Sequence, residues 1–297
     1  MINKPKVSII IPTYNREKII EETLLSAINQ DYDDYEIVIT DNCSTDKTYD
    51  ILKEYEKKYE NIRIYQNSKN LGPVRNWKKA IELAEGKYIK ILWSDDQISE
   101  DFLSKTVPIL ENDCEIAFVY TKTLIYSDKE ENICYSRRKK GKLKIEEFIK
   151  GVIGSSDAVP VSPGCALFRK KDLLDNLIID IPNAINPYGA GNDLLLFLLC
   201  YQKYKYFYYL DEIKSFFRAH PDSFTISNKL DIFYKKTIIY FLNLNKEGLK
   251  LYRNQYFSLL YIKNKELVKN EKFNFQLSYI LQKICFHKLL FPLSFSQ

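Results

Sequence analysis

The sequence predicts an α/β fold, with a mixed and mainly parallel sheet flanked by helices and a helical extension at the C-terminus. Apolar, strand-like runs alternate with amphipathic helical segments through the first 100 residues, which is the pattern of βαβ units with right-handed crossovers. The runs are continuous rather than alternating, which is typical of parallel strands buried on both faces. The 297 residues suffice for one large domain or for one domain with an appendage.

The first half supplies the regular alternation. Residues 7–11 form the first expected strand, which Pro12 ends, and Asn15 is expected to cap the helix that carries Ile20 and Leu24 on its apolar face. A second helix places Ile51, Leu52, Tyr55 and Tyr59 inward, and a third covers residues 74–84 before Gly86. The remaining strands of this half are expected at 35–40, 62–65 and 88–93.

The second half has mixed order. Strands are expected at 117–120, 166–169, 207–210 and 214–218, and helices at 145–152, 171–177 and 193–203. After Ser227 the pattern is helical, with breaks at 243–248 and 269–273. We therefore expect a main domain over residues 1–227 and a basic, aromatic-rich helical region over 228–297.

The charge is unevenly distributed. The chain carries a net charge of +5, but residues 225–297 hold 12 Lys/Arg against 4 Asp/Glu, which leaves −3 on the remainder. Such a basic tail indicates an acidic partner, either an anionic membrane surface or nucleic acid. No DNA- or RNA-binding motif is present, so we do not expect nucleic acid. The alternative is that these helices pack on the main domain or on a second subunit.

The cysteines and the hydropathy pattern bear on the compartment. The six cysteines are scattered without zinc-ligand spacing, and the chain is too large to need a disulfide framework. No apolar leader and no run of transmembrane length is present, because the longest apolar run covers only residues 194–201. We expect a cytoplasmic protein with reduced thiols, peripheral on the inner face of the membrane if the basic tail binds lipid.

Adjacent carboxylates follow the fourth expected strand. Asp95 and Asp96 stand where the carboxyl end of a strand opens into the ligand-binding crevice of an α/β sheet. Two acids there suit a hard divalent cation that holds a phosphate. The alternative is that Ser94, Asp95 or Asp96 caps a helix that begins near Ser99. These residues alone leave both interpretations open.

Four other residues carry similar pairs of interpretations. Asp41 ends the second strand and either accepts hydrogen bonds from a uracil-like base or forms an Asx-turn or a helix cap. Arg75 either contacts phosphate or base, or lies on a solvated helix face. Asp193 is either a general base or a helix cap, and its place at a helix N-terminus favours the ionised form. His220 either contacts a metal or diphosphate, or is structural. No glycine-rich dinucleotide or P-loop motif is present.

Together these residues resemble the inverting family 2 glycosyltransferases of the GT-A fold, over residues 7–227. Residues 7–15, residues 41–46 and the segment with Asn70, Gly72, Arg75 and Asn76 resemble the family's donor-side segments. Trp93-Ser94-Asp95-Asp96 occupies the place of its Asp-x-Asp motif, and Asn192-Asp193 that of its Glu-Asp pair. Arg218, His220 and Ser223 resemble its late Arg/His segment. Two positions depart from the pattern, since Trp93 replaces the first Asp and Asn192 replaces the Glu.

The resemblance implies inverting transfer of a sugar, hexosyl or N-acetylhexosaminyl, from a nucleotide diphosphate donor to an acceptor hydroxyl. A UDP-sugar is the expected donor, and a glycan or lipid-linked glycan of a surface polysaccharide or glycoconjugate the expected acceptor. Asp193 is the implied base, and Asp95, Asp96 and His220 are the implied ligands of Mn or Mg. The alternative is a nucleotide-sugar-binding protein without transferase activity. The implied donor-binding residues are Pro12, Tyr14, Asn15, Asp41, Asn70, Gly72, Arg75, Asp95, Arg218 and His220.

Overall fold

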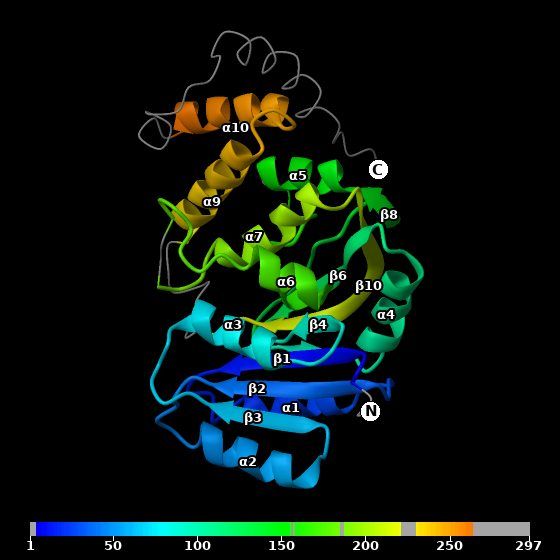
Figure 1. Cartoon of the computed structure of the whole chain (residues 1–297), viewed down its shortest axis with the longest axis vertical. Helices are drawn as coiled ribbons and strands as arrows, with labels where there is room; N and C mark the ends of the chain where they lie inside the picture. The colour runs from blue at the N-terminus through cyan, green and yellow to red at the C-terminus, as the bar shows by residue number, and fades with distance from the viewer. Residues whose placement is uncertain (1–3, 155, 157, 185–186, 221–229, 264–297) are drawn as a thin grey trace.

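The computed structural model describes residues 4–154, 156, 158–184, 187–220 and 230–263. Its elements follow the expected alternation in the first half and a mixed order in the second (Figure 1). The strands are β1 (Val7–Thr13), β2 (Tyr35–Asp41), β3 (Ile62–Gln66), β4 (Tyr88–Ile91), β5 (Gln97–Ile98), β6 (Ile116–Tyr126), β7 (Glu131–Cys134), β8 (Gly141–Lys144), β9 (Ala166–Arg169) and β10 (Tyr206–Arg218). The helices are α1 (Ile20–Ile28), α2 (Thr48–Lys58), α3 (Pro73–Leu83), α4 (Phe102–Asn112), α5 (Ile145–Ile153), α6 (Lys170–Asn176), α7 (Asn192–Leu198), α9 (Asp231–Leu244) and α10 (Lys250–Lys263), with 3-10 turns η1 (Pro163–Cys165) and η2 (Leu199–Gln202).

One mixed sheet joins the strands in the order β3-β2-β1-β4-β9-β6-β10-β5. Four of the seven neighbouring pairs on this path are parallel in the described residues, so the expected mixed, mainly parallel sheet is confirmed. Two antiparallel steps, β4–β9 and β9–β6, bring the strand direction back to that of β4. The carboxyl ends of β1, β2, β4, β6 and β10 therefore lie along one edge of the sheet.

The sheet is buried on both faces. Successive residues of β1 alternate between two apolar layers: Ile10 faces the layer that includes α3, α5, α6 and α7, whereas Ile9 and Ile11 face the layer of α1, α2 and α4. Each fully buried side chain of this kind stabilises the fold by about 1.5–3 kcal/mol. The continuous apolar runs of the sequence reflect this double burial.

The C-terminal helices belong to the first of these layers. Phe241 of α9 and Phe257 of α10 are buried in the same apolar cluster as the sheet residues and α7. The alternative in which these helices pack on the main domain therefore holds for the described part of the region. The boundary expected at residue 227 and the break at 269–273 lie outside the described residues. Within the described parts, no helix has the length and apolar character needed to cross a bilayer.

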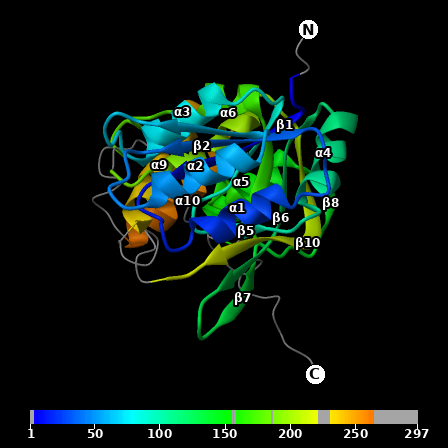
Figure 2. The same ribbon diagram turned by 90° about the horizontal axis from the view of Figure 1, so that it is seen from below.

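Several expected boundaries were wrong. The fourth strand ends at Ile91 rather than Trp93. The first strand continues past Pro12 to Thr13. Pro12 has no N–H to donate, but β4 no longer pairs with β1 at that position, so no ladder hydrogen bond is lost. Residues 207–210 and 214–218 form one strand, β10. Irregularities in its pairing register with β6 interrupt the strand pattern of the sequence between the two segments. The helix expected over 193–203 becomes 3-10 after Leu198. The short strands β5, β7 and β8 were missed. Figure 2 shows the β6–β7 hairpin projecting from the body of the protein.

Candidate functional site

The carboxylate of Asp95 lies beside an arginine and a histidine side chain at the edge where β4 and β10 end. His220 Nε2 lies 3.1 Å from Asp95 Oδ2, and Arg16 Nη2 lies 3.7 Å from the same oxygen. Arg16 comes from the loop after β1, and His220 follows β10. The topology thus brings together residues that are more than 200 positions apart in the sequence.

Asp96 faces the protein interior. Its Oδ1 accepts a hydrogen bond of 3.0 Å from the Arg218 backbone N–H, and the residue is only 5% exposed. Burial, reinforced by the negative charge of Asp95, raises the pKa of the Asp96 carboxyl well above its ordinary value. The two adjacent acids therefore have different environments: Asp95 faces Arg16 and His220 at the sheet edge, and Asp96 fixes the end of β10.

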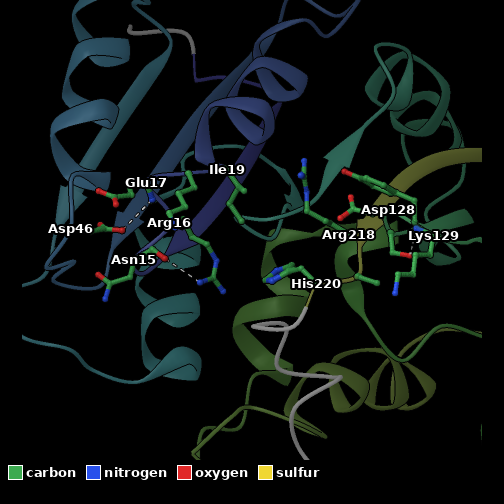
Figure 3. Close-up of a pocket in the computed structure, with 13 residues that line it drawn as sticks. Asn15, Arg16, Glu17, Ile19, Asp46, Asp128, Lys129, Arg218 and His220 are labelled. Atoms are coloured by element: carbon green, nitrogen blue, oxygen red, sulfur yellow. Dashed lines mark hydrogen bonds between the residues drawn. The ribbon is translucent and has the colours of Figure 1, made fainter.

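A cavity of about 660 Å³ opens at the same edge. Figure 3 shows Arg16 and His220 directed toward each other from its two sides, with Arg218 near His220. The β6–β7 hairpin closes the far side through residues 126–129. Four Arg and Lys residues and one His line the cavity beside three acids. This small excess of basic side chains suits an anionic ligand such as a diphosphate. The lining residues are Asn15, Arg16, Glu17, Lys18, Ile19, Asp46, Tyr126, Ser127, Asp128, Lys129, Arg218, Ala219 and His220.

The three residues implied as metal ligands do not converge. Asp95 and His220 lie side by side, whereas Asp96 is turned toward the Arg218 N–H. In the described ranges, no group of three or more His, Cys, Asp or Glu side chains is arranged to hold an ion. An oxygen donor from Asp95 and a nitrogen donor from His220, beside the cavity, fit a cation that takes its other ligands from substrate phosphates, as Mg commonly does. The residues present therefore fit a shared ion better than a protein-only metal centre.

Asp41 holds the turn that follows β2. It is fully buried, and its carboxylate accepts hydrogen bonds from the Ser44 N–H (3.1 Å), the Ser44 hydroxyl and the Gln66 amide (3.1 Å). These contacts hold the turn after β2, through a backbone bond from the third residue rather than from the second residue of an Asx-turn. A contact between Asp41 and a nucleotide base stays a prediction.

Asparagines fix the loops around Asp41. Asn42 and Asn67 are hydrogen-bonded to each other (3.0 Å), and Asn70 Oδ1 accepts from Asn42 (2.8 Å) and from the Gly72 N–H (2.8 Å). Asn76 of α3 donates to the Thr40 carbonyl (2.9 Å). Gly72 has φ +79°, a conformation that glycine adopts without strain. Asn70 and Gly72 thus shape the loop before α3, and their side of the site is polar and rigid.

The other residues implied on the donor side lie in different settings. Pro12 is buried within β1, and Tyr14 is 39% exposed on the loop that follows. Asn15 is not a helix cap: it has φ +51°, its side chain pairs with Thr45, and α1 begins only at Ile20. The Arg75 side chain is 55% exposed and pairs with Asp180 at 3.3 Å, and Arg75 does not line the cavity.

Two tryptophans lie between the cluster of Asp95, Arg16 and His220 and the turn that carries Asp193. The rings of Trp93 and Trp77 lie 4.9 Å apart, and Trp93 Nε1 donates to Ser162 Oγ (2.9 Å). Gly189 sits against Trp77, where an added Cβ would lie 2.4 Å from the ring. Trp93, which replaces the first Asp of the Asp-x-Asp motif, therefore has a packing role between Asp95 and the turn that carries Asp193.

Asp193 stands at the start of α7 and is 9% exposed. Its Oδ1 accepts from the Gly191 and Leu194 N–H groups, each at 2.8 Å, and its Oδ2 accepts from the Tyr234 hydroxyl at 2.8 Å. Burial raises its pKa to about 6, against these hydrogen bonds, which lower it. A carboxylate with this pKa is ionised at neutral pH and basic enough to take a proton, so both the capping and the base interpretation are compatible with its contacts.

Sequence reasoning missed three residues of this region. Arg16 and Tyr234 gave no local signal, because their partners lie 79 and 41 positions away. Lys90 did give one, as a charged residue inside the apolar run of β4. It is fully buried, donates to the Gly164 carbonyl, and its pKa is lowered to about 7 by burial. Lys90 therefore holds the η1 turn, which lies against Trp93.

The sequence is similar to known glycosyltransferases over part of its length. The model of the family described as glycosyl transferase family 2 matches residues 8–176. TuaG of Bacillus subtilis, named for teichuronic acid biosynthesis, is 40% identical over 116 residues, which cover 39% of this chain and 46% of TuaG. Abequosyltransferase RfbV of Salmonella typhimurium is 41% identical over 113 residues, 37% and 34% of the two chains. The chain thus spans less than half the length of these relatives.

A longer but weaker match covers more of the chain. The Campylobacter jejuni enzyme named GalNAc(5)-diNAcBac-PP-undecaprenol beta-1,3-glucosyltransferase is 28% identical over 225 residues, 75% of this chain and 68% of the relative. Among solved structures, Staphylococcus aureus TarS in complex with UDP-GlcNAc superposes with a TM-score of 0.69 at 21% identity, covering 93% of this chain and 79% of TarS. At that identity the likeness shows the fold alone, and the fold is the expected GT-A fold.

Proposed function

This chain belongs to glycosyl transferase family 2, and we propose that it transfers a sugar, with inversion, from a nucleotide diphosphate sugar to an acceptor hydroxyl. The observation that carries the proposal is a series of contacts between two acidic positions. Asp95, beside Arg16 and His220, follows Trp93; Trp93 packs on Trp77, and Trp77 lies against Gly189 of the turn that leads to the buried carboxylate of Asp193. Inverting transfer needs this combination of an anion-binding corner for the leaving group and a separate base for the acceptor.

On the donor side, the diphosphate occupies the cationic cavity. Arg16, Arg218 and His220 line it and would stabilise the negative charge that develops on the departing oxygens. The loop around Asp41 and Asn70 would hold the nucleotide base, since its hydrogen-bonded frame is rigid next to the ends of β1 and β2. UDP is the proposed nucleotide, because a structural neighbour of the same fold binds UDP-GlcNAc.

Asp95 and His220 would hold a divalent cation, Mn or Mg, together with the donor phosphates. When bound, the ion supplies Lewis-acid stabilisation of the diphosphate. A structural neighbour from Pyrobaculum calidifontis is described in complex with GDP-Man and Mn²⁺. Asp96 would contribute by fixing the Arg218 backbone rather than as a direct ligand.

On the acceptor side, Asp193 would take the proton of the attacking hydroxyl. The acceptor oxygen forms its bond to the anomeric carbon from the face opposite the diphosphate. The bond between that carbon and the diphosphate oxygen breaks, and its electron pair leaves with the nucleotide. One displacement of this kind inverts the anomeric carbon. General-base catalysis of this type contributes about 100- to 10,000-fold.

We further propose a glycan or lipid-linked glycan as the acceptor, in surface polysaccharide or glycoconjugate synthesis, and a peripheral site at the cytoplasmic face of the membrane. The name of TuaG, for teichuronic acid biosynthesis, and that of the Campylobacter jejuni enzyme, for an undecaprenol-linked glycan, support the acceptor class. Vesicles of anionic and neutral lipid test the membrane site, with a chain truncated after Lys263. This truncation spares the core residues of α9 and α10. Equal vesicle binding by the full and truncated chains contradicts a role for the tail.

The first experiment is nucleotide release from a panel of UDP-, GDP- and dTDP-sugars with Mn²⁺, with a mixture of lipid-linked glycans as acceptors. Stimulated release from one donor, lost in Asp95→Ala, supports the transferase and identifies its nucleotide. Nucleotide binding without release from any donor favours the alternative, a nucleotide-sugar-binding protein. Absence of both binding and release contradicts the proposed site.

A further inference from the structure

The buried carboxylate of Asp193 is held from outside its own turn by a helix of the C-terminal region. Two backbone N–H groups of the 191–194 turn occupy Oδ1, and only the Tyr234 hydroxyl of α9 occupies Oδ2 in the described residues. A carboxylate oxygen has two lone pairs, so one on Oδ2 stays available to an acceptor hydroxyl. The hydrogen bond from Tyr234 therefore fixes the position of Asp193 Oδ2 and leaves a lone pair on that oxygen to accept a proton.

Close packing of α9 on this turn keeps the contact in place. Gly191 has φ +91°, and a Cβ added there would lie 2.2 Å from Thr237 Oγ1 and 3.2 Å from the Phe233 carbonyl oxygen. Only a residue without a side chain permits this approach. Phe233, Tyr234 and Thr237 form one side of the first turns of α9, so the helix that touches Gly191 also presents the phenol to Asp193.

We propose that Tyr234 is a positioning residue of the transferase site: its hydroxyl holds Asp193 Oδ2 in the orientation in which that oxygen receives the acceptor's proton. This inference rests on the proposed function, in which Asp193 is the base. It also makes the C-terminal helices part of the reaction site, although the sequence places them beyond the main domain.

The electrostatic surroundings fix which group donates. The groups that face Asp193 from the described elements are Tyr234 of α9, Tyr135 after β7 and the N–H groups of its own turn, and none of these side chains is cationic. Burial, then the charge of Asp193, raises the pKa of Tyr234 far above neutrality, so the phenol stays protonated and the carboxylate accepts. The hydrogen bond stabilises the charged form of Asp193 and lowers its pKa.

The test is the pH profile of kcat for sugar transfer in Tyr234→Phe, which keeps the ring and removes the hydrogen bond. Loss of a hydrogen bond to the charged form should move the acidic limb of the profile up by about one pH unit. It should also lower kcat about 10-fold on the plateau, while KM for the donor is unchanged. Tyr256→Phe, a buried tyrosine of α10 away from Asp193, is the matched control and should leave the profile where it is.

A second variant tests the opposite direction. 3-Fluorotyrosine at position 234 is a stronger donor of the same size, so it should move the acidic limb to lower pH. An unchanged limb in both variants, with an active wild type and an inactive Asp193→Asn, overturns the role of Tyr234 and leaves the proposed function standing. If the wild type itself transfers no sugar, the proposed function fails, and with it this inference.

Discussion

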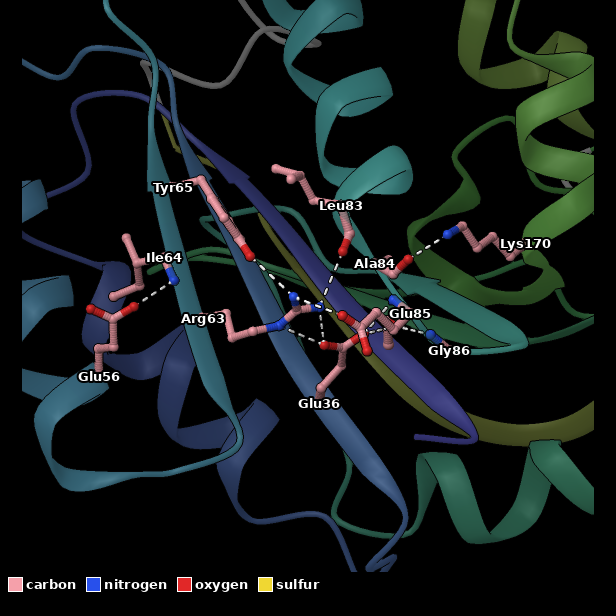
Figure 4. A network of polar contacts seen from close by, with 11 residues as sticks. Glu36, Glu56, Arg63, Ile64, Tyr65, Leu83, Ala84, Glu85, Gly86 and Lys170 are labelled. Carbon is pink, nitrogen blue, oxygen red and sulfur yellow. Dashed lines mark hydrogen bonds and ion pairs between the residues drawn. The ribbon is translucent and has the colours of Figure 1, made fainter. Parts of the chain in front are cut away.

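Two buried carboxylates at opposite ends of the sheet show how differently the fold treats a negative charge. Glu36, at the amino end of β2, accepts from Ser8 Oγ (2.6 Å), from the Glu85 N–H (2.6 Å) and from the Arg63 guanidinium, which compensates its charge (Figure 4). Asp193, at the carboxyl edge, accepts only from neutral donors in the described residues. Its pKa is raised to about 6.

The two environments suit different roles, stability for Glu36 and catalysis for Asp193. A guanidinium beside a buried acid compensates its negative charge, so the pair contributes to the fold. A buried acid without a cation is destabilising when ionised, and the same raised pKa makes it a better base. The comparison therefore predicts that mutations at the amino edge change stability, whereas mutations at the carboxyl edge change activity.

The largest expected effect is the loss of activity in Asp95→Ala. The substitution removes the acid that lies beside His220 and Arg16, so nucleotide release should fall by roughly 100- to 1,000-fold or more. The matched control is Asp113→Ala, just before β6, where the acid pairs with Lys142 and accepts from the Glu115 N–H far from the cavity. Equal turnover in the Asp95 variant and the control contradicts a role for Asp95 in transfer.

At the amino edge, Arg63→Met should destabilise the protein without slowing transfer. It leaves Glu36 buried without its counter-charge, and the partial exposure of Arg63 moderates the cost to about 2–3 kcal/mol of unfolding free energy. Urea denaturation measures this, and Arg63→Lys should recover part of the loss. A normal stability with impaired kcat would reverse the assignment of the two edges.

Asp193→Asn should have the opposite effect on stability. A raised pKa means that the stability contributed by this group is full below pH 4 and is lost as the pH rises from about 4 to 6. Asparagine keeps the acceptor for Gly191 and Leu194 but carries no charge. At pH 7.5 the variant should therefore be more stable by about 1–2 kcal/mol, and near pH 4 the two proteins should match. Thermal denaturation at both values checks the prediction, and a less stable variant at pH 7.5 contradicts it.

The smallest effect is expected for Arg75→Ala. Its ion pair with Asp180 is more than half exposed, so stability should change by less than about 0.5 kcal/mol. Lys78→Ala, which removes an exposed cation of the same helix, is the control. A rise in the donor KM for the Arg75 variant alone supports the donor contact that the sequence resemblance implies. Equal KM values in the Arg75 variant and the control contradict that contact.

The sequence predicted most of the sheet, because its strands carry continuous apolar runs and its loops carry polar residues at the strand ends. It also placed Asp95, Asp193 and His220 at ends of elements. It could not predict that Arg16 meets Asp95 or that Tyr234 meets Asp193, since tertiary packing alone brings these pairs together. Short strands such as β5 were missed for a similar reason: two residues hold no periodicity, and β5 exists only through its pairing with β10.

The role of Asp193 as the base is tested by measuring transfer rate and donor affinity together in Asp193→Asn at pH 8, where the wild-type carboxylate is ionised. We expect kcat to fall by about 100- to 10,000-fold. Calorimetry with the nucleotide diphosphate should show a Kd within about twofold of wild type, because Asp193 contacts no part of the donor cavity. Loss of nucleotide binding, with normal turnover of whatever donor still binds, would contradict the assignment of Asp193 as the base.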